Sequence, residues 1–168
     1  NKYFNNSSKQ VEIEITYPRN SCTPLEGFVV HSYYDHDDET YTVQSNFQGP
    51  YSLHSVLSRA LKTDEGKLRL ISINDSGGSF GIKQAIMPMI ILTSLASKIT
   101  NKNVVWIEDR MEHLTAASSA TGRLTKIKAS VSNDGLINAI DYDQVDDVGA
   151  YLRAPEPASL YRMHGNLS

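Results

Sequence analysis

The chain has 168 residues, of which 40% are hydrophobic and 21% charged, and its formal net charge at pH 7 is −3. This length and composition are ordinary for a soluble globular protein with a core of its own. The acidic balance and the lack of a basic run disfavour nucleic acid as a partner. The longest apolar segment, residues 85–96, is interrupted and shorter than the roughly 20 residues of a membrane span, so we expect no membrane span.

Residues 1–10 are rich in Asn, Ser and Lys and contain no apolar signal core. We expect them to be a cut end or a linker, and we expect the protein to be cytoplasmic. Residues 11–17 then alternate apolar and polar side chains, which predicts a half-buried strand that ends at Pro18. Residues 27–34 and 40–45 predict two further strands, joined by an acidic turn at residues 35–39. Together these segments predict a small antiparallel sheet.

The middle and end of the chain predict helices and a long hairpin. Apolar side chains at helical spacing after Pro50 predict an amphipathic helix over residues 50–62. A strand at residues 67–73, a glycine loop and an apolar helix at residues 84–99 follow, and residues 104–107 predict the next strand. The turn signal Asn133-Asp134-Gly135 lies between strands expected at residues 123–131 and 136–145. The expected fold class is α+β: one unit with a mixed sheet, two main helices and a long C-terminal β-hairpin.

The most informative stretch is the glycine loop, Gly77-Gly78-Ser79-Phe80-Gly81-Ile82-Lys83. Glycines let the backbone approach another body closely, and the start of a helix presents free N–H groups to anionic or oxo groups. The loop is not a Walker A motif, because Ile82 separates Gly81 from Lys83, and it does not match Gly-x-Gly-x-x-Gly either. A ligand-contacting loop and a purely structural turn both remain open on this pattern.

Two other constellations suggest chemistry. The string from Gly77 to Gly81 matches the Gly-x-Ser-x-Gly pattern of serine hydrolases, with Ser79 as nucleophile, but only His113 and His164 follow it. The segment Glu108-Asp109-Arg110-Met111-Glu112-His113 fits either an acid/base site or a charged helical turn after a strand, with local ion pairs that contribute little at a surface. We favour the turn.

Metal and thiol chemistry receive little support from the sequence. The carboxylates of the last strand lack the Gly and Glu spacing of a calcium loop; they are Asp141, Asp143, Asp146 and Asp147. The single cysteine, Cys22, excludes an internal disulfide and is expected to be an inert, half-buried thiol.

Four strings in chain order carry a family resemblance: Pro24-Leu25-Glu26-Gly27, Phe47-Gln48-Gly49-Pro50, the glycine loop, and Val105-Trp106-Ile107-Glu108-Asp109-Arg110-Met111-Glu112-His113-Leu114. Together they resemble the molybdopterin-binding subunit of the molybdenum hydroxylases, the family of xanthine dehydrogenase, aldehyde oxidase and the aerobic carbon monoxide dehydrogenase large subunit. The resemblance covers nearly all of the chain from Val11 onward.

The resemblance implies an oxidoreductase that hydroxylates or oxidises an aldehyde, a heterocycle or carbon monoxide with water-derived oxygen. It implies molybdopterin, in its cytosine dinucleotide form, with molybdenum held by the pterin and not by side chains of this chain. It also implies 2Fe-2S clusters and FAD on partner subunits or domains. The implied cofactor-binding residues are Gln48, Gly77, Gly78, Ser79, Phe80 and Gly81.

Their implied roles differ. Gln48, the implied catalytic residue, would donate a side-chain amide hydrogen bond to a molybdenum oxygen. Phe80 and Gly81 would place their backbone against the apical ligand of the metal, and Gly77 and Gly78 would line the approach. Ser79 replaces the middle glycine of the family's Gly-Gly-Gly-Phe-Gly-x-Lys pattern.

The resemblance further implies that residues 11–168 are the first part of an incomplete molybdopterin-binding domain. The family's later Ala-Tyr-Arg-Gly loop and its catalytic glutamate are expected to lie elsewhere. We therefore expect the isolated chain to be inactive and to need the remainder of the molybdenum subunit, with iron–sulfur and flavin subunits. The alternatives are a cofactor-free structural or assembly module of the same fold, and a serine hydrolase that uses Ser79.

Overall fold

The computed structural model describes Phe4 and residues 9–150, and these residues form two compact units. The first unit combines residues up to Asn20 with residues from Ala120 onward, and the second contains Ser21–Ser119. The sequence pattern had indicated one unit. The division arises because the first strand of the chain pairs with the late hairpin and not with the strands that follow it directly.

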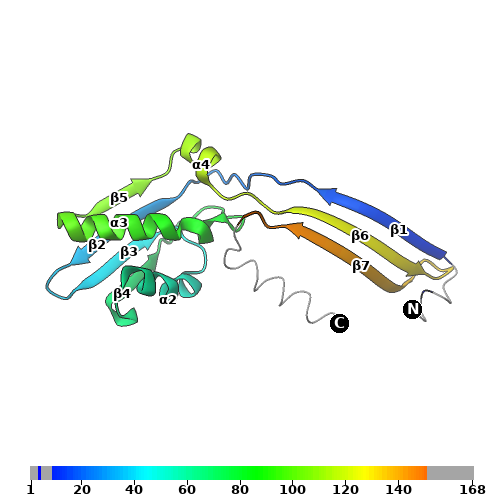
Figure 1. The fold of residues 1–168 in the computed structure, drawn as a ribbon, viewed down its shortest axis with the longest axis horizontal. Helices are drawn as coiled ribbons and strands as arrows, with labels where there is room; N and C mark the ends of the chain where they lie inside the picture. The colour runs from blue at the N-terminus through cyan, green and yellow to red at the C-terminus, as the bar shows by residue number, and fades with distance from the viewer. Residues whose placement is uncertain (1–3, 5–8, 151–168) are drawn as a thin grey trace. The chain divides into compact units, whose positions relative to one another are not determined.

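The first unit is an antiparallel sheet of three strands in the order β1-β6-β7 (Figure 1). Its strands are β1 (Lys9–Tyr17), β6 (Gly122–Val131) and β7 (Ile137–Asp147). The predicted hairpin between β6 and β7 is confirmed, and Gly135 in its turn has a φ of 85°, which favours glycine. β1 begins at Lys9, inside the segment expected to be a linker; residues 1–3 and 5–8 lie outside the described residues.

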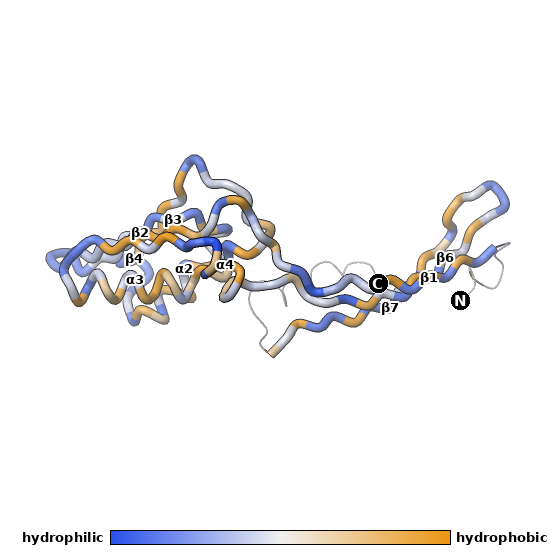
Figure 2. The backbone as a smooth tube through the Cα atoms, turned by 90° about the horizontal axis from the view of Figure 1, so that it is seen from above, coloured by the Kyte–Doolittle hydropathy of each residue, from blue (hydrophilic) through white to orange (hydrophobic). Residues whose placement is uncertain are grey.

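The strand at residues 11–17 is confirmed, but the prediction that it is half-buried is wrong. All nine residues of β1 are exposed. The alternation in β1 does separate two faces, since Ile13 lies opposite Ile127 while Glu14 lies opposite Lys126. A similar alternation of hydrophobic and hydrophilic residues is visible along β7 in Figure 2. Alternation marks the faces of a strand, whereas burial needs a second layer, and the described residues of this unit form a single layer.

The second unit contains a mixed sheet in the order β4-β3-β2-β5. Its strands are β2 (Val29–Asp35), β3 (Thr40–Ser45), β4 (Leu68–Ser72) and β5 (Val104–Ile107). β2 is antiparallel to β3 and β5, whereas β3 and β4 are parallel. The mixed sheet is as expected, and the predicted antiparallel pairing of the strands on either side of residues 35–39 is confirmed. The first strand is not part of this sheet, because β1 belongs to the other unit.

Helices cover one face of this mixed sheet (Figure 1). They are α2 (Pro50–Leu61) and α3 (Met87–Thr100), and a 3-10 helix (Ile82–Ile86) leads into α3. α4 (Arg110–Ala116) follows β5, and a further 3-10 turn lies at Glu65–Lys67. The predicted apolar helix therefore starts as 3-10 and becomes α-helical only at Met87. The core lies between sheet and helices, formed by Val30, Tyr41, Val43, Leu53, Leu57, Ile86 and Ile90 among others.

α3 also packs on the sheet through buried hydroxyl groups. Thr93 Oγ1 lies 2.8 Å from Ser32 Oγ, and Ser97 Oγ accepts the backbone N–H of Tyr34 at 3.0 Å. The Thr93 hydroxyl also bonds to the Met89 carbonyl and the Ser97 hydroxyl to the Lys102 carbonyl, so these buried polar groups are satisfied.

The helical segment Ile82–Thr100 is long and apolar enough, by length and composition, to cross a membrane, contrary to the expectation from the interrupted apolar run. It has 19 residues, its most apolar window has a mean hydropathy of 1.2, and 39% of that window is buried inside the fold. Ile90 and the hydroxyls of Thr93 and Ser97 belong to its sheet-facing side. These contacts are those of a helix packed on a sheet.

Candidate functional site

The structure brings Gln48 and the glycine loop together although 31 residues separate Gln48 from Ser79. The Ser79 hydroxyl donates to Gln48 Oε1 at 2.5 Å, and the Gln48 backbone N–H donates to Lys83 O at 3.4 Å. Gln48 follows β3 and the loop follows β4. Because β3 and β4 are parallel neighbours, the segments after them leave the sheet at the same edge.

The loop presents strained backbone and exposed donors. Phe80 has a φ of 49°, which is uncommon for a bulky residue, and its side chain is 73% exposed. Gly81 follows with a φ of 88°. Within the described residues, the backbone N–H groups of Gly78, Ser79, Phe80 and Gly81 have no hydrogen-bond partner. Among the described residues, these N–H groups are therefore left as unpaired donors.

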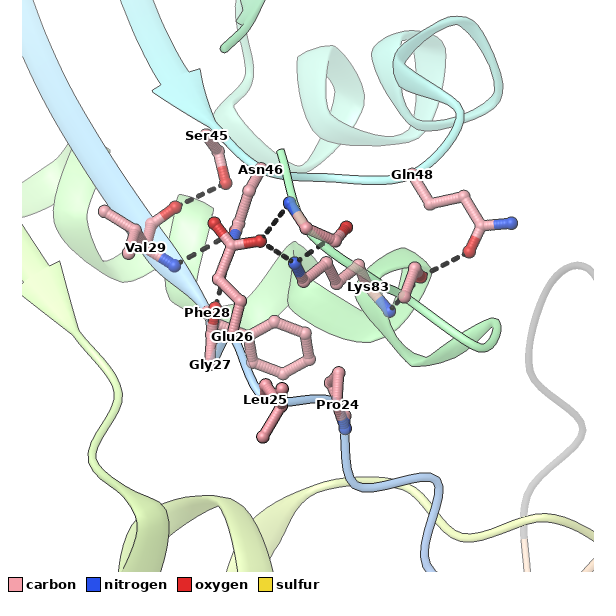
Figure 3. Close-up of polar contacts among 12 residues, drawn as sticks. Pro24, Leu25, Glu26, Gly27, Phe28, Val29, Ser45, Asn46, Gln48 and Lys83 are labelled. Carbon is pink, nitrogen blue, oxygen red and sulfur yellow. Dashed lines mark hydrogen bonds and ion pairs between the residues drawn. The ribbon is translucent and has the colours of Figure 1, made fainter. Parts of the chain in front are cut away.

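An ion pair between buried Lys83 and partly exposed Glu26 holds the two ends of the loop. Lys83 is 1% exposed, and its Nζ lies 2.7 Å from Glu26 Oε2 (Figure 3). The same oxygen accepts the backbone N–H of Gly77. A Cβ on Gly77 would meet this oxygen at 2.5 Å, so a larger residue there would have to displace the Glu26 carboxylate. The Lys83 hydrogen bond foremost, with smaller contributions from Asn46 and Gly77, lowers the pKa of Glu26 against the opposing effect of burial.

The segment that carries Glu26 is itself fixed by side chains from distant parts of the chain. Asn46, which precedes Gln48, donates from Nδ2 to Gly27 O at 2.8 Å and accepts the Val29 N–H at 3.1 Å. Arg110 donates to the carbonyls that precede Glu26, those of Pro24 and Leu25, both at 2.8 Å. Three of the four strings that carried the family resemblance thus meet at the Glu26 segment, and Asn46, which directly precedes the fourth, joins them there.

The interpretation of the Glu108 to His113 segment as a surface turn is wrong for its two ends. The side chains of Glu108 and His113 are 3% and 1% exposed, and Glu108 Oε2 lies 2.8 Å from His113 Nδ1. The same oxygen accepts the backbone N–H of Phe28 at 3.0 Å. Between these ends, Asp109 and Glu112 form a capping box at the start of α4. The segment is a structural anchor for β2 and α4, and its exposed middle alone matches the charged turn.

The surroundings of Ser79 argue against a hydrolase nucleophile. Its proton is donated to the Gln48 carboxamide oxygen, and Lys83 N–H donates to its Oγ at 3.2 Å. No histidine in the described part of the chain bonds to it, and His164 lies outside those residues. A nucleophile of this class needs a base at its hydroxyl, which Gln48 does not supply.

Comparison with known proteins identifies the family. The whole chain, residues 1–168, matches the family model described as the molybdopterin cofactor-binding domain. The chain belongs to the molybdopterin cofactor-binding domain family of the molybdenum hydroxylases.

Curated relatives and a solved structure extend this finding. The chain is 30% identical over 157 residues to the nicotine 6-hydroxylase large subunit of Paenarthrobacter nicotinovorans, and 29% identical over 157 residues to the carbon monoxide dehydrogenase large chain of Hydrogenophaga pseudoflava. Each alignment covers 94% of this chain and 19% of the relative. The fold is similar to quinoline 2-oxidoreductase from Pseudomonas putida 86, with a TM-score of 0.77 and 23% identity over 92% of this chain and 20% of that one.

The donors of this molybdopterin cofactor-binding domain fit such a cofactor. Since Oε1 of Gln48 accepts the Ser79 proton, its Nε2 keeps both N–H donors and has no partner among the described residues. Together with the unpaired loop N–H groups, it provides neutral donors for an oxo or anionic acceptor. The described residues contain no group of three or more His, Cys, Asp or Glu side chains that could hold a metal ion.

The residues that shape the loop were missed by reasoning on the sequence, which assigned roles to the glycines and to Gln48. Glu26, Asn46, Lys83 and Arg110 were all within or beside the four quoted strings. One signal was available: Lys83 stands at the start of a helix whose residues from Ala85 onward are mostly apolar, and a lysine buried there requires an acidic partner. The identity of that partner was not encoded locally.

Proposed function

We propose that this domain supplies one part of the molybdenum site of an oxidoreductase, with Gln48 and the glycine loop facing the cofactor. The observation that carries the proposal is the meeting of the Gln48 carboxamide and the loop at one edge of the mixed sheet, with their N–H donors unpaired. When bound, molybdopterin would supply the redox chemistry by which water-derived oxygen enters an aldehyde, a heterocycle or carbon monoxide.

The residues of this chain would bind and orient. The Nε2 of Gln48 would donate a hydrogen bond to an oxygen of the cofactor, and the N–H groups of Phe80 and Gly81 would face it from the loop. Glu26 and Lys83 would keep the loop in place through their ion pair. Donors that are fixed before binding need no reorganisation, which is why a rigid loop suits this role.

The proposal extends to polypeptide outside the 168 residues. The chain spans about a fifth of the length of the curated relatives that it matches, which supports a site completed by further polypeptide. The relatives are named as a large subunit, a large chain and a complex subunit gamma, which supports partner chains. We include in the proposal the cytosine dinucleotide form, iron–sulfur and flavin partners, a cytoplasmic location and inactivity of the isolated chain.

The experiment is to purify the natural protein with its partner chains from molybdenum-replete cells and to measure molybdenum, pterin and dye-linked oxidation of aldehydes, N-heterocycles and carbon monoxide. We expect bound molybdenum and turnover of one substrate class. Gln48→Ala should keep the molybdenum and lose about 100-fold in kcat, the usual effect of removing one such donor. Gln44→Ala, on the exposed side of β3, is the matched control and should leave both unchanged.

Two results would count against the proposal. A natural protein without molybdenum and pterin would favour the alternative, a cofactor-free structural or assembly module. A Gln48→Ala variant with the kcat of the parent would remove Gln48 from the site.

A further inference from the structure

The Ser79 side chain has two hydrogen bonds that give it a direction. Lys83 N–H donates to Ser79 Oγ at 3.2 Å, and the Ser79 hydroxyl donates to Gln48 Oε1 at 2.5 Å. Because the backbone N–H supplies a proton to the oxygen, the hydroxyl proton turns away from Lys83 and toward Gln48. A serine hydroxyl normally rotates freely between donor and acceptor roles, but here it is fixed as a donor to the carboxamide.

This direction matters for a glutamine. The terminal torsion of its side chain is broad and nearly two-fold, so the carbonyl oxygen and the NH₂ group can exchange places at little cost. In one orientation the NH₂ group of Gln48 points away from Ser79. In the other orientation the carbonyl oxygen, with its lone pairs, points away from Ser79. An oxo or anionic acceptor would be repelled by the second orientation.

We propose that Ser79 is a positioning residue that fixes the Gln48 carboxamide with its NH₂ group directed away from Ser79 and toward the cofactor. The inference rests on the proposed function, since it assumes that the cofactor lies beside Gln48. It assigns a role to the residue that replaces glycine in the family pattern, a role that a glycine has no side-chain atom to perform. The gain is an orientation that is set before the cofactor binds.

The test uses the natural holoprotein with its partner chains, reduced with dithionite in the absence of substrate. Electron–nuclear double resonance reports protons near molybdenum(V), and exchangeable ones disappear in D₂O. Gln48→Ala identifies the signal of the Gln48 amide by removing it. In Ser79→Ala this signal should fall to about half, because two orientations of similar energy remain when the hydroxyl is absent.

Matched variants separate this role from a structural one. Ser79→Thr keeps a hydroxyl and should keep the signal. Ser76→Ala changes the exposed serine directly before the glycine loop and should also keep the signal. Ser79→Gly removes the hydroxyl without adding bulk and should reproduce Ser79→Ala. Only preparations with the molybdenum content of the parent are compared, so a folding defect is not mistaken for lost orientation.

A double-mutant cycle gives the second readout. Ser79→Ala should lower kcat roughly 2- to 13-fold, the range expected for one hydrogen bond, and should have no further effect in a Gln48→Ala background. A full amide signal in Ser79→Ala, with Gln48→Ala still removing it, would overturn the positioning role and leave the proposed function intact. A signal that survives Gln48→Ala would overturn the proposed function, and the inference with it.

Discussion

The ion pair of Glu26 and Lys83 should respond unequally to the loss of either partner. Lys83 is 1% exposed, and among the described residues its Nζ contacts one other acceptor, Gly77 O at 3.5 Å. Glu26 is 31% exposed and also accepts the Gly77 N–H. Glu26→Gln therefore leaves a buried ammonium without a counter-charge, while Lys83→Met leaves a carboxylate that water reaches. We expect the first change to be the more damaging.

The magnitude follows from the burial. Removing one partner of a buried ion pair costs about 3–5 kcal/mol of stability. Because Glu26 is partly exposed, we expect Glu26→Gln to destabilise the loop by about 3 kcal/mol. Lys83→Met should cost about 1–2 kcal/mol, because its apolar chain fills the same space and one hydrogen bond is lost. The double variant should cost less than the sum of the two, since no uncompensated charge remains buried.

The assay is hydrogen exchange with mass spectrometry on the natural protein, read on peptides that cover the glycine loop. A loss of about 3 kcal/mol would speed exchange of the loop amides by roughly 100-fold in Glu26→Gln. The matched control is Glu14→Gln, which breaks an exposed pair with Lys126 at 3.5 Å and should change exchange little. Equal or greater opening in Lys83→Met than in Glu26→Gln would refute the reasoning.

Three further predictions concern the same unit. The pKa of Glu26 is held below its ordinary value of 4.5, so its stabilising effect is complete above pH 4.5 and is lost as the pH falls through the lower folded-state pKa. Hydrogen exchange of the loop amides, corrected for intrinsic rates, should therefore accelerate below about pH 4.5 in the parent but not in Glu26→Gln. Gly77→Ala should reduce molybdenum content more than Gly81→Ala does, because a Cβ at position 77 displaces the Glu26 carboxylate. A Cβ at position 81 meets nothing within 4 Å and costs only the backbone strain of about 1–2 kcal/mol. Equal losses of molybdenum in the two variants would contradict this. Glu108→Leu should lower the thermal unfolding temperature, since it leaves the Phe28 N–H and a buried ring nitrogen of His113 unpaired at about 1–3 kcal/mol each, and an unchanged transition would show that the pair is not an anchor.

Local signals in the sequence were sufficient for much of the fold. The strand Thr40–Ser45 was predicted with its observed ends, and the Asn133-Asp134-Gly135 turn was placed correctly. The alternation of apolar and polar residues in a strand, and a turn that requires positive φ, depend only on residues close together in the sequence. Short stretches of the chain are therefore sufficient to predict them. The same holds for the motif strings, which led to the family before any geometry was known.

Tertiary structure decided which segments meet and which charges are buried. Nothing within residues 11–17 specifies that they pair with β6, more than a hundred residues away, and nothing in the Glu108 to His113 string shows that its two ends are buried. Pairing and burial depend on groups supplied by distant parts of the chain, and their free energy is not a property of either segment alone. The sequence by itself determined the elements and the family. Only the fold placed Gln48 beside Ser79, because parallel β3 and β4 bring the segments after them to the same edge of the sheet. It also placed Glu26 beside Lys83, because Glu26 precedes β2, and β2 is antiparallel to β3.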